Sequence, residues 1–244
     1  MQKSMDFLVM RGDRRQNLLC DLLIADGHRA QLVGGPESWG RENLPPPGAF
    51  LVTASADETV RRGALEQGFR LAEYGALPSF REENGAITAE GALQVAMKHR
   101  LRTLRGSDAL VIGWGCIGRP LAGLLRAVGC TTVAVAVRRE ECLAQVGQRG
   151  FSGWLADELE TRAGAYDLIF NTAPAPVLSL EVLEQLRPGV LVVDLASRPG
   201  GVDWEGARAL GIKAVHALAL PGQLVPVSGA AAIRNAVYEL CREV

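Results

Sequence analysis

The chain has 244 residues, 48% of them hydrophobic, which is enough for one large or two modest domains with buried cores. Its formal net charge of −1 gives no basic excess for binding nucleic acid. The five cysteines form no CxxC motif or Cys/His cluster, and no apolar run reaches about 18 residues. We therefore expect no metal site, no signal peptide and no membrane span, and we place the protein in the cytoplasm.

The first part of the chain alternates short β-like runs with helix-length amphipathic segments, which is typical of an α/β protein with mostly parallel strands. Strands are predicted at "DFLVM" (6–10), "RAQLVGG", "AFLVTAS" and near "FRLAEY". A helix through "RRQNLLCDLLIAD" should end before Gly27, and another should lie around 57–67. The proline-rich "RENLPPPG" (41–48) is predicted to be irregular.

The next segment, "NGAITAEGALQVAMKHRLRTLRG" (84–106), is predicted to be one long helix. Thr88 and Glu90 would lie in its first turns, where unpaired N–H groups and the helix dipole favour an acid or a bound anion. We place the boundary between two domains inside this helix.

A second array of strands and helices begins at "DALVIGWGCIG" and continues through "TVAVAVRR", "YDLIFNTAP", "GVLVVDLASRPGG" and "IKAVHALALPG". The pattern predicts an α/β protein with a Rossmann-type doubly wound parallel sheet at 106–228 and a smaller α/β substrate domain at 1–85. Residues 86–105 would form the inter-domain helix. The last helix (229–244) is a candidate to pack back onto the first domain.

The stretch "ALVIGWGCIGRPLAGLLRAVG" combines a strand, a glycine turn and a helix, and Gly113, Gly115 and Gly118 give the G-x-G-x-x-G pattern. The first glycine permits the turn, the second lets backbone approach a pyrophosphate, and the third lets helix and strand pack closely. Because the flanking strand and helix are both present, we predict a dinucleotide site that also includes Cys116 and Ile117. The alternative is a purely structural turn.

Two arginines, Arg138 and Arg139, follow the next strand, "VAVAV", where a dinucleotide-binding fold often carries an acid that holds the ribose hydroxyls. A guanidinium pairs with a 2′-phosphate instead. We therefore predict NADP as the preferred cofactor, with NAD as the other option. The alternative is that both arginines are solvated at the start of a helix.

Two later strand ends are also candidates, because ligands of such sheets lie beyond the carboxyl ends of the strands. They supply Asn171, Thr172, Pro174, Asp194, Ser197 and Arg198. These positions resemble those that line the nicotinamide in two-domain dehydrogenases, and the alternative is that both are ordinary Pro/Gly loops. We also assign Pro221, in "LALPG", to the cofactor site.

The chain resembles the dipicolinate synthase A-subunit family. The likeness lies in "DLASRPGG" with the following "LALPG", in "NTAPAPVLSLEVLEQLRPG", in the glycine loop, in "ITAEGALQVAMKH" and in "RGDRRQ". It covers residues 78–244 well and the first thirty-five residues moderately. The region between "LVTAS" and "LAEYGALPSF" is shorter than in the family, so the N-terminal domain is expected to be a shortened one.

The resemblance implies an NAD(P)-linked oxidoreductase that converts dihydrodipicolinate to dipicolinate in the mother cell of a sporulating bacterium. It also implies a second, flavoprotein-like subunit, and a homo-oligomer is a further option for the assembly. Two substrate carboxylates call for cations, for which we choose Arg15 and Arg198, and a substrate loop is expected near Ser55.

For catalysis we choose Glu90 as proton acceptor and Thr88 as the residue that orients the substrate, with Ser197 and Arg198 beside them. The alternative for Glu90 is a helix-capping acid. Two other functions stay open: a dehydrogenase of another small carboxylate, and a non-catalytic nucleotide-binding subunit that supports a partner.

Overall fold

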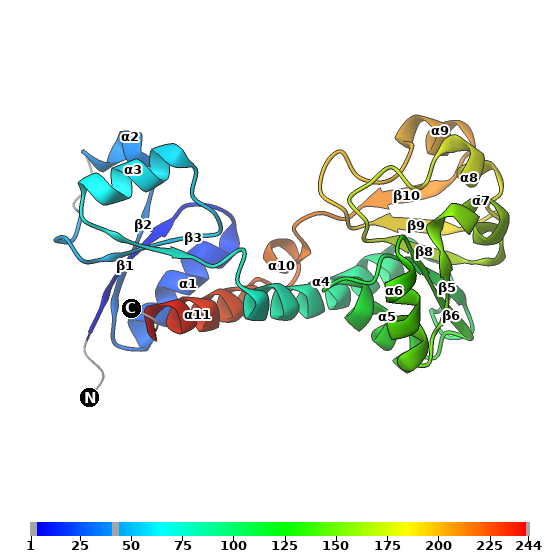
Figure 1. Cartoon of the computed structure of the whole chain (residues 1–244), viewed down its shortest axis with the longest axis horizontal. Coiled ribbons are helices and arrows are strands. Elements are labelled where there is room, and N and C mark those ends of the chain that lie inside the picture. Colours follow the sequence, from blue (N-terminus) through cyan, green and yellow to red (C-terminus); the bar gives the residue numbers. More distant parts are fainter. Residues whose placement is uncertain (1–3, 41–43, 243–244) are drawn as a thin grey trace. The chain divides into compact units, whose positions relative to one another are not determined.

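The computed structural model describes residues 4–40 and 44–242. The chain divides into two compact units, which we call the N-terminal unit (Met1–Ile87 with Pro221–Val244) and the central unit (Thr88–Leu220). Each is built on its own parallel sheet with helices on both faces (Figure 1). The predicted α/β class is confirmed.

The sheet of the N-terminal unit has four strands in the order β2-β1-β3-β4, all parallel. They are β1 (Asp6–Met10), β2 (Arg29–Val33), β3 (Phe50–Thr53) and β4 (Arg70–Glu73). All four were predicted as short β-like runs. Of the proline-rich segment 41–48, residues 41–43 lie outside the described residues, and the rest forms no helix or strand.

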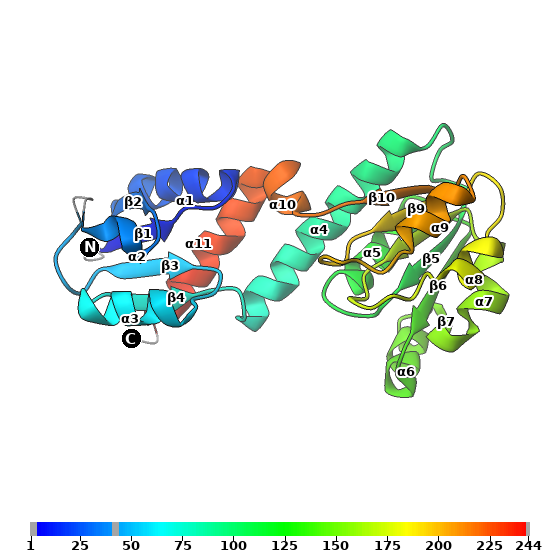
Figure 2. The ribbon, with the colours of Figure 1, turned by 90° about the horizontal axis from the view of Figure 1, so that it is seen from above.

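Helices cover this sheet (Figure 2). They include α1 (Arg14–Ala25), α2 (Pro36–Trp39), α3 (Glu58–Glu66) and α11 (Pro226–Arg242). Successive residues of a strand point to opposite faces. Phe7 accordingly packs with residues of α1 and α11 such as Ile233, while Leu8 packs with Trp39 of α2. The C-terminal helix therefore completes the core of the unit that the N-terminal strands begin.

The central unit has a six-stranded parallel sheet in the order β10-β9-β8-β5-β6-β7. Its strands are β5 (Asp108–Ile112), β6 (Thr132–Val137), β7 (Ser152–Leu155), β8 (Leu168–Asn171), β9 (Leu191–Asp194) and β10 (Lys213–His216). This is the strand order of the doubly wound dinucleotide-binding fold, with the reversal between β5 and β8. The predicted Rossmann-type sheet is confirmed, although β7 was not foreseen.

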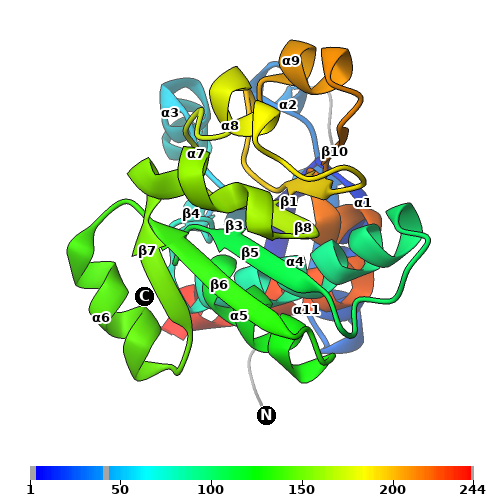
Figure 3. The same cartoon turned by 90° about the vertical axis from the view of Figure 1, so that its right-hand side faces the viewer.

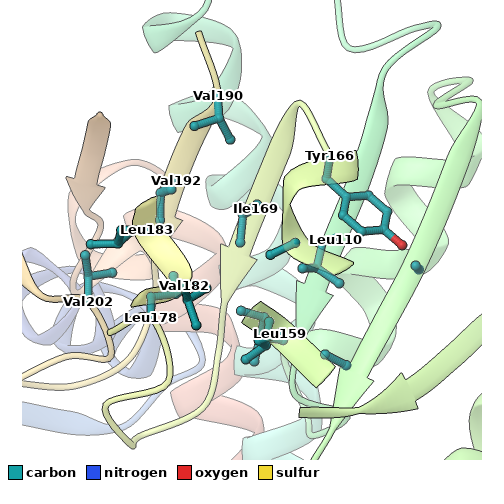
Figure 4. Packing of buried hydrophobic residues seen from close by; sticks show 14 of the residues in the cluster. Leu110, Leu159, Tyr166, Ile169, Leu178, Val182, Leu183, Val190, Val192 and Val202 are labelled. Carbon is teal, nitrogen blue, oxygen red and sulfur yellow. The ribbon is translucent and has the colours of Figure 1, made fainter. Parts of the chain in front are cut away.

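The helices of the central unit lie on both faces of the sheet (Figure 3). On one face are α5 (Gly118–Ala127) and α6 (Glu140–Gln148), and on the other are α7 (Leu159–Arg162), α8 (Leu180–Glu184) and α9 (Trp204–Ala209). Leu110, Ile169 and Val192 from three neighbouring strands pack against Leu159 and Val182 of the second group (Figure 4). This core fixes the strand ends that carry the candidate site.

The long helix α4 runs over Pro78–His99, so the predicted bounds of 84–106 were wrong at both ends. Pro78 suits the first turn of a helix, because its missing N–H would be unpaired there anyway. The helix then continues through Asn84. Thr88 and Glu90 consequently lie in the helix interior, where the N–H groups are already paired, and the argument from free N–H groups does not apply to them.

The two remaining elements lie near the C-terminus. Helix α10 (Leu220–Gln223) is short, and α11 begins at Pro226, three residues before the predicted start at 229. The predicted end at 243–244 lies outside the described residues. Within the described part of the chain, no helix is long and apolar enough to cross a membrane.

Candidate functional site

The candidate site lies at the carboxyl ends of β5 and β8, the point where the strand order of the central sheet reverses. Ligands of open parallel sheets bind at this point because the loops that leave the two strands diverge there. The loop after β5 is the predicted glycine loop (113–118), and it leads directly into α5.

The fold itself requires glycine at the first and third positions of the motif. Gly113 has a φ of +104°, and a carbon built on it would lie 2.4 Å from Oγ1 of Thr172. A carbon built on Gly118 would lie 2.1 Å from the carbonyl oxygen of Gly113. The start of α5 therefore packs against the end of β5 at a distance that only glycine allows.

Gly115 differs from its two neighbours in the motif. It is exposed, its φ is not in the left-handed region, and no atom of the structure lies within 4 Å of a carbon built on it. The described residues give no local reason for glycine here. A pyrophosphate lying against the backbone would supply that reason, because a side chain would occupy its place.

The N-terminus of α5 suits an anion. The N-cap residue Ile117 offers no side-chain cap, and no acid lies in the first turn of the helix. The first N–H groups of a helix carry a partial positive charge and favour phosphate when no side chain caps them. Cys116 and Ile117 are partly exposed at this end. The loop and the helix start therefore fit a dinucleotide.

Asn171 and Asp194, two predicted cofactor contacts, are fully buried and pair with each other. Nδ2 of Asn171 donates to Oδ1 of Asp194 at 2.8 Å and to the carbonyl of Ala173 at 3.1 Å. Asp194 also accepts from the backbone N–H groups of Ala196 (3.1 Å) and Gly201 (2.8 Å). The geometry gives both residues a bracing role: they tie the loop after β8 to the loop after β9.

Thr172 and Pro174 lie on the loop after β8, next to the glycine turn. The Thr172 hydroxyl donates to the carbonyl of Ile112 at 2.9 Å, so it links the loop after β8 to the last residue of β5. Pro174 is exposed. Both residues lie at the edge where the prediction placed them.

The loop after β9 carries Ser197 and Arg198, both exposed. The side chain of Arg198 makes no hydrogen bond or ion pair with any described residue. Asp203, a nearby acid with which Arg198 could pair in a bracing role, instead caps α9 by accepting from the N–H of Gly206 at 3.0 Å. Arg198 is therefore available to a ligand, at the carboxyl edge of the sheet.

Arg138 and Arg139 directly follow β6 and are exposed. Arg139 is the N-cap residue of α6, and its Nη2 lies 3.7 Å from Sγ of Cys142. Arg138 has no side-chain partner among the described residues. The two cations thus stand at the strand end next to the glycine loop, on the strand that pairs with β5.

Thr88 and Glu90 do not share a face of α4. Residues two apart on a helix point about 200° away from each other, and Thr88 is buried while Glu90 is exposed. Glu90 has no ion pair with a described residue, so its carboxylate is free to act, whereas Thr88 is packed inside. The structure therefore places the two residues on different faces of α4.

Arg15 and Ser55 belong to the N-terminal unit, at the carboxyl edge of its sheet. Ser55 is exposed in the loop after β3. Arg15 is already engaged: Nε donates to both carboxylate oxygens of Asp13 (3.0 and 3.1 Å) and Nη2 to Oδ2 at 2.8 Å. Pro221 lies in α10 and is grouped with the N-terminal unit, not with the glycine loop.

Sequence reasoning missed Asp13, which sets the state of Arg15. Burial raises the pKa of the Asp13 carboxyl, but hydrogen bonds and the charge of Arg15 outweigh burial, and its pKa is lowered from 3.8. The available signal was the Asp at the start of a predicted helix, since Asp is a preferred N-cap. Its carboxylate indeed accepts from the N–H of Arg15.

No protein-family model matches the chain. Among curated proteins, the dipicolinate synthase A-subunit of Bacillus subtilis is 35% identical over 161 residues, which is 66% of this chain and 54% of that protein. Glucose 1-dehydrogenase of Thermoproteus tenax is 32% identical over 128 residues (52% and 36%). Shikimate dehydrogenase (NADP(+)) of Geobacillus kaustophilus is 32% identical over 133 residues (50% and 48%).

Solved structures share this fold over nearly the whole chain. The dipicolinate synthase A-subunit from Bacillus halodurans aligns with a TM-score of 0.81 at 22% identity, covering 97% of both chains. Its counterpart from Bacillus subtilis aligns with a TM-score of 0.83 at 23% identity, covering 100% of this chain and 97% of that one. At these identities the structural likeness concerns the fold.

The fold and the glycine loop define a two-unit α/β protein whose central unit is a Rossmann nucleotide-binding unit, the class to which many dehydrogenases belong. Within that class the chain is similar in sequence to a dipicolinate synthase A-subunit and in fold to two of them, in line with the predicted resemblance. It spans about half of the length of the curated relative that it matches.

Proposed function

We propose that the protein is an NADP-linked oxidoreductase subunit that oxidises dihydrodipicolinate to dipicolinate during spore formation. The observation that carries this proposal is the 35% identity with the A-subunit of Bacillus subtilis, since that relative is named for the synthesis of dipicolinate. In this proposal the chain works in the cytoplasm of the mother cell with a second, flavoprotein-like subunit.

The cofactor part of the proposal rests on four features of the central unit. Gly115 leaves backbone open to a pyrophosphate, the start of α5 is uncapped by side chains, and Arg138 and Arg139 are exposed at the end of β6. These residues would hold the dinucleotide, with the arginines on its 2′-phosphate. A bound NADP would supply the hydride acceptor for the oxidation.

The substrate part assigns charge and proton transfer to the chain's own residues. Arg198 is exposed with no partner among the described side chains, so it can pair with a carboxylate through two N–H groups. Glu90 is a free carboxylate that can accept the proton released when the ring becomes aromatic. Since the aromatic product is strongly favoured, positioning of the two rings supplies most of the remaining rate.

One assay separates the proposal from its alternatives. NADPH formation is followed from freshly generated dihydrodipicolinate, with and without the second subunit. NADPH formation by the chain alone or with its partner supports the proposal. NADP binding without any turnover in either case would identify a non-catalytic nucleotide-binding subunit.

A dehydrogenase of another small carboxylate is a second candidate, because the chain is also 32% identical to shikimate dehydrogenase (NADP(+)) over 133 residues. In that case NADPH would form from shikimate or a hydroxy acid and not from dihydrodipicolinate. The same assay with shikimate as substrate tests it.

A further inference from the structure

A cleft of about 590 Å³ opens at the amino edge of the central sheet, the edge opposite to the glycine loop. Strands β9 and β10 begin at this cleft with Leu191 and Lys213, and residues 100–102, which follow α4, form another part of its wall. All of the lining residues belong to the central unit. The cleft is therefore separate from the candidate dinucleotide site, although both belong to the same unit.

Positive charge predominates in the lining of the cleft. Four of its side chains are cationic at neutral pH and two are anionic: Arg100, Arg102, Arg187 and Lys213 against Asp167 and Glu184. One of the acids is already paired, because Oδ1 of Asp167 accepts from Nη1 of Arg187 at 3.1 Å and Oδ2 accepts from the N–H of Asp108 at 3.1 Å. The charge that is left for a ligand is mostly positive.

Two of the cations have no partner. The side chains of Arg102 and Lys213 are exposed and make no hydrogen bond or ion pair with a described residue. A cation in the last turn of a helix offsets the helix dipole, which accounts for His99 at the end of α4. Arg102 lies beyond that helix and Lys213 begins β10, so the same reason does not apply to them. Both are available to an anion.

The rest of the lining is largely apolar. Leu183 and Val190, two residues of the core that Figure 4 shows, also line the cleft. At the surface Leu101 is fully exposed, and Leu210 is 43% exposed. One exposed leucine is ordinary on a protein surface, but here two of them line a cleft that also carries unpaired cations. The cleft thus offers positive charge and apolar surface together.

The exposure of these groups favours a protein as the occupant. A small ligand is usually buried over about 70–90% of its surface, whereas Leu101, Arg102 and Lys213 extend into solvent and would leave such a ligand wet. Ion pairs that stay in water contribute little. A protein segment adds surface of its own, which excludes water from the contacts that it makes.

We propose that this cleft is a docking site for an acidic segment of a partner protein, in which carboxylates flank an apolar side chain. The carboxylates pair with Arg102 and Lys213, and the apolar side chain covers Leu101 and Leu210. Because the cleft and the glycine loop lie at opposite edges of the sheet, the partner can bind while the dinucleotide site is occupied. The proposal does not depend on which substrate the protein oxidises.

The test uses the full chain and a fluorescent peptide in which pairs of glutamates alternate with single leucines. Fluorescence anisotropy should show saturable binding that weakens several-fold from about 50 to about 200 mM salt, because salt screens exposed charges. Replacing Arg102 and Lys213 together with glutamate should weaken the peptide about tenfold. The matched control replaces Arg62 and Arg149, two exposed arginines outside the cleft, and should change the affinity by less than about twofold.

A second pair of variants tests the apolar contact. Leu101→Ser removes a fully exposed side chain, so it should weaken the peptide several-fold without affecting the fold. Leu65→Ser, at an 80% exposed leucine of α3, is its control and should change nothing. A peptide with serine in place of leucine should bind more weakly and should not respond to Leu101→Ser. NADP binding should be the same in all variants.

Several outcomes would overturn the proposal. If the glutamate–leucine peptide does not bind, or if the glutamate–serine peptide binds equally well, the cleft does not select a segment of this chemistry. Equal effects of the cleft variants and their controls would mean that only the overall charge attracts the peptide. If the variant of Arg102 and Lys213 melts at a lower temperature and Leu101→Ser binds normally, the two cations serve the fold.

Self-association of the chain is the remaining alternative. Sedimentation velocity on the chain alone should show the same species for the unchanged protein and for Leu101→Ser. An oligomer that Leu101→Ser dissociates would show that the occupant is a second copy of this chain, and the proposal of a separate acidic partner would then be wrong.

Discussion

Asn171 and Asp194 form a fully buried hydrogen-bonded pair, with Nδ2 and Oδ1 2.8 Å apart, at the ends of the neighbouring strands β8 and β9. The two residues align in register, 23 residues apart in sequence. A carbon built on Gly200 would lie 2.5 Å from Oδ2 of Asp194, and one built on Gly201 would lie 2.2 Å from Nδ2 of Asn171. The glycine pair of "DLASRPGG" is therefore required by this polar pair.

Asp194→Ala should lower the free energy of unfolding by about 2–4 kcal/mol, because one hydrogen of the buried Asn171 amide and the N–H groups of Ala196 and Gly201 lose their acceptor. Chemical denaturation measures the change. Asp203→Ala removes only a helix cap and should cost about 1 kcal/mol. Equal effects of the two substitutions would contradict the bracing role.

Gly115→Val should abolish NADP binding and leave the fold intact, since no atom lies within 4 Å of the added carbon and only a bound pyrophosphate would meet it. Gly118→Ala is the matched contrast, because its methyl group would lie 2.1 Å from a carbonyl oxygen and should lower the melting temperature. Thermal unfolding and NADP titration on both variants check this. A valine variant that melts normally and still binds NADP would show that the loop is only a turn.

Replacing both Arg138 and Arg139 with alanine should make the binding free energy of NADP less favourable by about 2–4 kcal/mol. Each charged hydrogen bond contributes about 1.5–3 kcal/mol, and the two arginines are partly redundant. NAD has no 2′-phosphate, and its affinity should hardly change. Titration of both cofactors measures the difference, and equal losses would mean that the arginines do not contact the 2′-phosphate.

Arg198→Ala should lower kcat/KM by a factor that corresponds to about 2–4 kcal/mol of lost transition-state stabilisation. This is the scale for removing a desolvated charge partner of a substrate carboxylate. Arg198→Lys should recover only part of this loss, because lysine lacks the planar two-point contact. Since Arg198 braces no described residue, melting temperature and NADP affinity should stay constant. A loss of stability in step with activity would assign Arg198 a structural role instead.

The Asp13–Arg15 pair predicts an acid-dependent step in stability. The carboxyl of Asp13 has a folded pKa below 3.8, so its contribution is fully present above the unfolded value and is lost as the pH falls through the folded pKa. Arg15→Met should reduce this dependence, because it removes the side-chain hydrogen bonds and the charge that lower the pKa and keeps only the hydrogen bond from the backbone N–H of residue 15. Melting temperatures from about pH 6 to about pH 3 measure it, and parallel curves for both proteins would refute the assignment.

The glycine loop could be predicted from sequence because its requirements are local: a turn, a close approach and a helix start within six residues. The position of β7 could not be predicted from sequence. Only Trp154 of its four residues is buried, and an edge strand needs little apolar alternation. The start of α4 at Pro78 was missed because Asn84 and Gly85 suggest a turn, and packing of the helix outweighs that local preference.

The contacts that decide the roles of individual residues also could not be predicted from the sequence. Whether Arg198 pairs with Asp203 depends on whether Asp203 is used as a helix cap, and local spacing allows both. The pairing of Asn171 with Asp194 depends on the register of two strands 23 residues apart. Thr88 and Glu90 were grouped by closeness in sequence, although helix geometry separates them.

The return of the chain to its first sheet has a consequence for biosynthesis. The core around Phe7 and Leu19 also needs Ile233 and Val237 of α11, while the central unit is one uninterrupted segment, Thr88–Leu220. On the ribosome the central unit can therefore finish folding while the N-terminal strands still wait, with an apolar face uncovered, for the last helix to emerge. Domains ordinarily fold in the order of synthesis, whereas in this chain the unit that is begun first is expected to be completed after the central unit.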